Sequence, residues 1–130
     1  ACGHVQNLDI VNPEILFRDY IFTTSSSAGL VAHFRSYAID IIKELVIAPG
    51  SLVVEIGSND GTLLKFFQEA NMRVVGIDPA RDIAKQASNN GVQTIPEYFG
   101  PKLSAQIQKE HGQAKLIVAN NVYAHADELG

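Results

Sequence analysis

The chain has 130 residues, and ten Lys and Arg against fourteen Asp and Glu give it a net charge of −4. Apolar residues make up 46% and charged residues 18%, which excludes wholesale disorder and fits one globular domain. The scattered basic residues argue against a nucleic-acid partner, and no apolar run is long enough for a membrane helix.

The N-terminal residues 1–24 have no clean hydrophobic period, apart from one short turn at Pro13–Phe17. The hydroxyl residues at 24–27 can cap a helix, because apolar residues then recur at three and four residues as far as Leu45. Pro49-Gly50 ends this helix. The chain begins without a start Met, so we expect it to be a fragment of a longer protein.

From Ser51 onward, short apolar runs alternate with helical patterns. Strands are expected at 52–56, 73–78, 92–95 and 116–119, with helices at 62–72, 80–89 and 102–110. Because every connection has the length of a helix, the strands should be parallel. The predicted fold is therefore α/β, a doubly wound parallel sheet preceded by a helical arm.

The loop after the first strand reads Glu55-Ile-Gly57-Ser-Asn59-Asp-Gly61 and opens a helix. Gly57 permits a tight turn, Gly61 lets the helix start lie close to a ligand, and helix N-terminal amides can receive an anion. The spacing of the glycines departs from the dinucleotide fingerprint. The alternative is that both glycines only make a tight turn.

Asp78 ends the second strand, where an acid can accept hydrogen bonds from ribose hydroxyls. The alternative is an acid that serves the dipole of the following helix. Together with the glycine loop, Asp78 favours ribose binding.

Three motifs resemble those of a known family. Val54–Thr62 and Gly76–Pro79 are similar to motif I and the second strand end of class I S-adenosylmethionine-dependent methyltransferases, which have a Rossmann-like fold. Ala119–His125 resembles the segment after strand four in the C-methyltransferases of nucleotide-linked deoxysugars. The resemblance implies S-adenosylmethionine as cofactor, a nucleotide-linked keto-deoxysugar as substrate, and methylation at carbon. The single Cys suggests a reducing compartment, so we expect the protein in the cytoplasm.

The resemblance also implies a set of cofactor-binding residues at three strand ends. In it, Glu55 approaches the methionine amino group, with a strand-end acid that caps the 59–62 turn as the alternative. Asn120 and Asn121 bind the methionine part or are plain turn residues. The full set is Glu55, Gly57, Ser58, Asn59, Gly61, Asp78, Pro79, Asn120 and Asn121.

Aromatic residues flank the expected site. Tyr98 and Phe99 follow the third strand, where adenine lies in this fold, and stacking on adenine would suit them. We favour a place in the core for Phe99. Tyr20 can approach the ligand from the N-terminal segment or remain outside the site.

His125 is the candidate for proton transfer near the sugar, with a helix N-terminus or an exposed loop as the alternative. The resemblance places the main base beyond Gly130, so these 130 residues alone should be inactive. Cys2 resembles a remnant ligand of the family's zinc module, which implies zinc in the parent protein only and no complete metal site here.

These readings divide the chain into a zinc-module remnant and linker (1–24), a helical arm (25–50) and a truncated cofactor domain (51–130). The exposed edge of the fourth strand makes self-association an expectation. The alternative functions are a nucleoside-binding module without catalysis and a nicotinamide-dependent enzyme.

Overall fold

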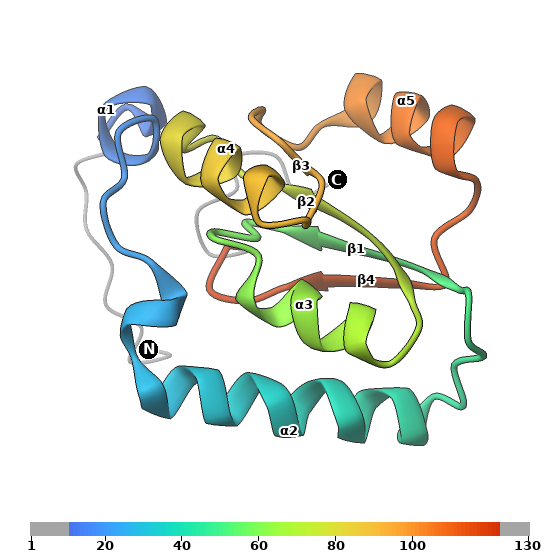
Figure 1. The fold of residues 1–130 in the computed structure, drawn as a ribbon. Coiled ribbons are helices and arrows are strands. Elements are labelled where there is room, and N and C mark those ends of the chain that lie inside the picture. Colours follow the sequence, from blue (N-terminus) through green and yellow to red (C-terminus); the bar gives the residue numbers. More distant parts are fainter. Residues whose placement is uncertain (1–10, 123–130) are drawn as a thin grey trace, which may run out of the picture.

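The computed structural model describes residues 11–122 and has a parallel four-stranded sheet at its centre (Figure 1). The strand order is β3-β2-β1-β4, so the sequence order reverses between β1 and β4. The strands are β1 (Leu52–Ile56), β2 (Arg73–Ile77), β3 (Thr94–Ile95) and β4 (Leu116–Ala119). The predicted α/β, doubly wound parallel sheet is confirmed.

Helices connect the strands and precede them along the chain. They are α1 (Pro13–Phe17), the 3-10 helix η1 (Thr24–Ser26), α2 (Ala28–Glu44), α3 (Thr62–Glu69), α4 (Arg81–Asn89) and α5 (Pro101–His111). β3 is shorter than expected because the Val92 amide donates to Ala87 O and so closes the end of α4. Among these helices, none is both long and apolar enough to cross a membrane.

Two apolar clusters lie on opposite faces of the sheet, because successive strand residues point to opposite sides. On one face, Val53 of β1 packs with Phe67 of α3 and with the apolar residues of α2. On the other face, Val54 packs with Ile107 of α5. Figure 1 shows α2 and α3 below the sheet and α5 above it.

The apolar stripe of α2 joins the same core as α3. The Ser27 hydroxyl accepts a hydrogen bond from Leu30 N at 3.4 Å and caps the helix, as the sequence predicts. Phe34 and Ile41 pack against the core. The expectation that Leu45 continues the stripe is wrong: its side chain is 49% exposed, because the helix ends one residue earlier. The division of the chain at residues 24 and 50 stays a prediction.

The segment between α1 and α2, residues 18–27, is called the N-terminal arm below and runs along the edge at which the strands end. Figure 1 shows the segment between α1 and α2, in blue, on the left of the molecule, where the arrowheads of β1 and β4 point. Parallel α/β sheets bind ligands outside the carboxyl ends of their strands, next to the point where the order reverses. The fold therefore places the arm beside the expected ligand edge.

Gly61→Ala should destabilise the protein more than Gly50→Ala does. Both glycines have a positive φ, +76° and +81°, so each alanine is strained in the left-handed region. A Cβ at Gly61 would also lie 2.9 Å from Val92, whereas nothing lies within 4 Å of one at Gly50. We expect a loss in the free energy of unfolding of about 1–2 kcal/mol for Gly50→Ala and about 1–3 kcal/mol more for Gly61→Ala.

Urea titrations of both variants measure this difference. Val92→Ala should recover only a small part of the loss in Gly61→Ala, because it removes the two methyl groups that the new Cβ meets but leaves the Val92 Cβ at 2.9 Å. Equal losses for the two glycine variants would show that backbone strain alone decides the outcome.

Candidate ligand-binding site

The carboxyl ends of three neighbouring strands bring together three of the predicted site residues. Glu55 of β1 pairs with Gly76 of β2 and with Val118 of β4. Asp78 and Asn120 therefore follow directly on the two strands that flank Glu55. The parallel register places these side chains at one edge of the sheet, as the sequence predicts.

The backbone amides of the β1–α3 loop are bonded within the protein. Gly57 N and Ser58 N both donate to Ile77 O, at 2.7 and 3.1 Å, and Asn59 N donates to Asp78 Oδ2 at 2.7 Å. Gly57 has a φ of +70°, and a Cβ there would run into the side chain of Val122. The tight turn expected at Gly57 is therefore present and leaves no room for a side chain.

Asp78 accepts hydrogen bonds from two segments, the β1–α3 loop and the start of α4. Its Oδ2 accepts from Asn59 N, and its Oδ1 accepts from Ala80 N at 2.9 Å, just before α4. Burial raises the pKa of Asp78, and the hydrogen bonds from Ala80 and Asn59 act against that rise. The alternative role at the helix start is thus realised, while each carboxylate oxygen keeps a lone pair for another donor.

The buried Glu55 and the partly buried Asn120 form a polar pair at the ends of β1 and β4. Glu55 is 3% exposed, and burial raises the pKa of its carboxyl well above the usual range. The Asn120 amide counters part of this rise, and the Asp78 and Asp60 carboxylates add to it. Within residues 11–122, Glu55 Oε2 and Asn120 Nδ2 have no hydrogen-bond partner. Because buried polar atoms are rarely left unpaired, this pair indicates a place for a polar ligand.

Asp60 has a structural role that the sequence analysis missed. Its Oδ1 accepts from Thr62 N at 3.2 Å and from Thr62 Oγ1 at 2.7 Å, and its Oδ2 accepts from Ser25 N at 2.9 Å. Burial would raise the pKa of Asp60, but the bonds from Ser25 and Thr62 outweigh it and lower the pKa. Asp60, and not Glu55, therefore caps the turn before α3. An Asp two residues before a helical Thr was the available signal.

Three predicted cofactor-binding residues of this loop make contacts within the protein. The Ser58 side chain packs over Gly76, and the Asn59 amide binds the N-terminal arm. The open side of Gly61 faces Val92, so packing within the protein already requires a glycine there. Binding through these residues stays a prediction.

The remaining members of the predicted set lie at the ends of the same strands. Pro79 is partly buried between Asp78 and Ala80. Asn121 is exposed and has a φ of +56°, a conformation that suits a turn. Ligand roles for both stay predictions.

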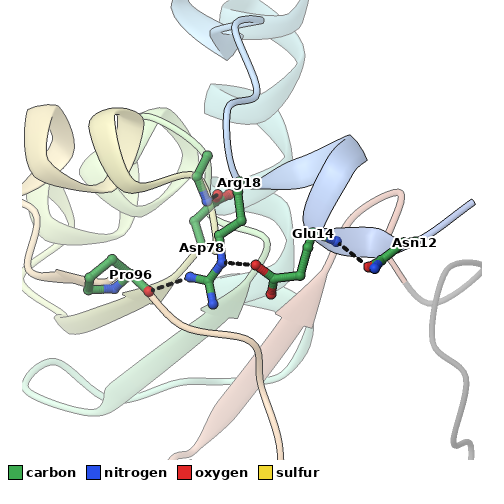
Figure 2. Close-up of polar contacts among 6 residues, drawn as sticks. Asn12, Glu14, Arg18, Asp78 and Pro96 are labelled. Carbon is green, nitrogen blue, oxygen red and sulfur yellow. Dashed lines mark hydrogen bonds and ion pairs between the residues drawn. The ribbon is translucent and has the colours of Figure 1, made fainter.

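The loop after β3 forms the far side of the edge. The Arg18 guanidinium lies 4.9 Å from the centre of the Tyr98 ring, and Figure 2 shows the same side chain reaching Pro96 O. Burial raises the pKa of the Tyr98 hydroxyl. The core position expected for Phe99 is wrong: it is 41% exposed and borders a groove of about 240 Å³ beside α5. Tyr20 is 43% exposed, and its ring centre lies 6.3 Å from that of Phe17.

Two predicted residues lie outside the described part of the chain: His125 and Cys2. Within the described part, no group of three or more His, Cys, Asp and Glu side chains is arranged to hold a metal ion.

Comparison with known proteins finds methyltransferases. A family model described as "Methyltransferase domain" matches residues 31–129. The C-methyltransferase NovU of Streptomyces niveus is 35% identical over 120 residues, which are 92% of this chain and 29% of NovU. This chain thus spans less than a third of that relative.

Solved structures share the fold. The magnesium protoporphyrin IX methyltransferase ChlM of Synechocystis PCC 6803, solved with bound SAM, has a TM-score of 0.53 at 17% identity, covering 83% of this chain and 53% of that one. A putative S-adenosyl-L-methionine-dependent methyltransferase of Methanococcus maripaludis has a TM-score of 0.50 at 15% identity, covering 98% and 58%. At these identities the likeness concerns the fold.

Glu55→Gln should make the protein less sensitive to rising pH. The raised pKa of Glu55 means that the folded state holds this proton more tightly than the unfolded state does. The stability it contributes is full below the unfolded-state pKa and is lost as pH rises through the folded-state pKa. Melting temperatures from pH 4 to 9 should therefore show a gap, variant above wild type, that widens with pH.

Glu44→Gln is the matched control, because Glu44 is an exposed glutamate at the end of α2. Its pH profile should run parallel to that of the wild type. A Glu55→Gln profile parallel to the wild type would contradict the buried, desolvated state of Glu55.

Proposed function

The chain belongs to the methyltransferase domain family, and from this premise we propose that its sheet edge binds S-adenosylmethionine for a methyl transfer. The observation that carries the proposal is that Glu55, which is buried, and Asn120 each have a buried polar atom, Oε2 and Nδ2, without a hydrogen-bond partner within residues 11–122, at the same sheet edge as Asp78. An amino acid joined to a nucleoside offers complementary groups for all three side chains.

Each side chain has a distinct part in this proposal. The Glu55 carboxylate holds the ammonium group of the methionine moiety, and the Asn120 amide donates to its carboxylate. The free lone pairs of Asp78 accept from the ribose hydroxyls, while its existing bonds to Asn59 N and Ala80 N keep the carboxylate in place. When bound, S-adenosylmethionine supplies an electrophilic methyl group.

The charge of the edge favours this cofactor over a nicotinamide dinucleotide. Glu55, Asp60 and Asp78 all lie at this edge, and the charges of the two aspartates raise the pKa of Glu55. The ammonium and sulfonium charges of S-adenosylmethionine relieve that repulsion, whereas a pyrophosphate would add to it. The amides of Gly57, Ser58 and Asn59, which would cradle phosphates, are already bonded.

For the longer polypeptide we propose C-methylation of a nucleotide-linked keto-deoxysugar. The sequence motifs and the 35% identity to a C-methyltransferase support this substrate class. In the reaction a base takes a proton from the carbon beside the sugar ketone. That carbon then bonds to the methyl group as the bond between the methyl carbon and the sulfonium sulfur breaks, which leaves S-adenosylhomocysteine. His125 is this chain's candidate for moving the proton. The proposal also includes a further base outside these residues, zinc in the parent protein, and self-association.

The protein should bind S-adenosylhomocysteine and fail to bind NAD at matched concentration. Titration calorimetry at pH 7.5 measures both, and a methyl-transfer assay with labelled S-adenosylmethionine and a keto-sugar nucleotide follows for the longer polypeptide. Binding of NAD with comparable affinity would favour the nicotinamide alternative, and binding of neither ligand would overturn the proposal.

Asp78→Ala should weaken S-adenosylhomocysteine binding by about 1–3 kcal/mol, because ribose hydroxyls lose their acceptor. Calorimetry gives the dissociation constant, and a melting curve shows that the variant is folded at the assay temperature. Asp82→Ala is the control, since Asp82 is an exposed acid in the first turn of the same helix, α4. Unchanged affinity in a folded Asp78→Ala variant would exclude the ribose role.

A further inference from the structure

The N-terminal arm is attached to the β1–α3 loop by the side chains of Asn59, which was expected to bind a ligand, and Asp60. Asn59 Oδ1 accepts from Thr24 N at 2.8 Å and from Thr24 Oγ1 at 3.3 Å, and Asn59 Nδ2 donates to Phe22 O at 2.9 Å. Asp60 Oδ2 accepts from Ser25 N at 2.9 Å. Both polar ends of the Asn59 amide are thus used by one short segment of the arm.

A second attachment joins the arm to the loop after β3. Arg18, at the end of α1, donates to Pro96 O at 3.3 Å and lies over the Tyr98 ring, while Glu14 holds its Nε at 2.8 Å. Figure 2 shows Arg18 between Glu14 and Pro96. The arm therefore spans from the loop after β3 to the loop after β1. β2, which Asp78 directly follows, lies between those two strands in the sheet.

The first attachment is coupled to the proposed ribose acid through a single residue. The backbone N–H of Asn59 is held by Asp78, and its side chain is held by the arm. Asn59 has a φ of +50°, a conformation that Asn tolerates better than most residues and that the Asp78 bond helps to fix. Asn59 therefore links Asp78 to Thr24, through its backbone N–H on one side and its side-chain amide on the other.

We propose that residues 18–25 form a strap that closes the adenosine end of the cofactor site, and that Asn59 and Asp60 are positioning residues that hold it there. The proposal rests on the proposed function. In it, the strap slows the departure of the bound nucleoside and keeps water from the ribose end of the edge. In this proposal Asn59 acts through the strap.

Two variants on opposite sides of the contact test the strap in the full chain. Asn59→Gly removes the amide but keeps a residue that adopts a positive φ without strain. Thr24→Pro removes the amide donor at the first position of η1, which follows an extended residue, Thr23, and so accepts proline. Ser26→Ala is the matched control, because the Ser26 hydroxyl bonds only to Thr23 O, within the arm.

We expect both variants to weaken S-adenosylhomocysteine binding by about five- to tenfold, mainly through faster dissociation in stopped flow. The double variant should be no weaker than the worse single one, because both remove the same contact. In the wild type, saturating S-adenosylhomocysteine should slow hydrogen exchange of the amides at 24 and 25, and Asn59→Gly should abolish this slowing. Ser26→Ala should match the wild type in every measurement.

Two results would overturn the inference in distinguishable ways. Both variants could bind S-adenosylhomocysteine with wild-type affinity while the amides of the arm exchange hydrogen faster. This result would show that Asn59 only holds the arm in place and that the strap has no part in binding. Absence of S-adenosylhomocysteine binding by the wild type would overturn the proposed function together with the strap.

Discussion

The order of the whole ligand edge depends on the carboxylate of Asp78. It joins the loop after β1 to the start of α4, through Asn59 N and Ala80 N, and it does so from a side chain that is 7% exposed. Since the Asn59 backbone is fixed in this way, its amide is aimed at the arm. One buried acid thus orders a loop, a helix start and, through Asn59, the segment at Thr24, which lies 35 residues from Asn59 along the chain.

The same edge carries an electrostatic cost, because three acidic side chains lie close together there. Glu55, Asp60 and Asp78 gather at one edge, and the ion pairs within residues 11–122 involve none of them. Asp60 and Asp78 are compensated by N–H and O–H donors of the protein, whereas the Glu55 Oε2 is left without a partner. Stability is thus given up at one carboxyl, as is common where a site must keep a polar group ready for a ligand.

The strand order along the chain and the meeting of Glu55, Asp78 and Asn120 were predictable, because parallel strands place their carboxyl ends side by side. The contacts of Asn59 and Asp60 were not, since they join segments far apart in sequence and no local pattern announces them. The exposure of Phe99 likewise depends on how α5 lies over the sheet. In each of these cases tertiary packing decides, and a single sequence does not report it.

The contact between the N-terminal arm and the β1–α3 loop has a consequence for which residues should vary among related sequences. Apart from the Thr24 hydroxyl, the arm contributes only main-chain groups to the contact, namely two amides and the Phe22 carbonyl. Most side chains in the arm can therefore change without breaking it, provided that proline stays out of positions 24 and 25. At this attachment selection would act chiefly on Asn59 and Asp60, so correlated substitutions between the arm and the β1–α3 loop would be few even though the two segments touch. The attachment to the loop after β3 differs, because it depends on the Arg18 side chain.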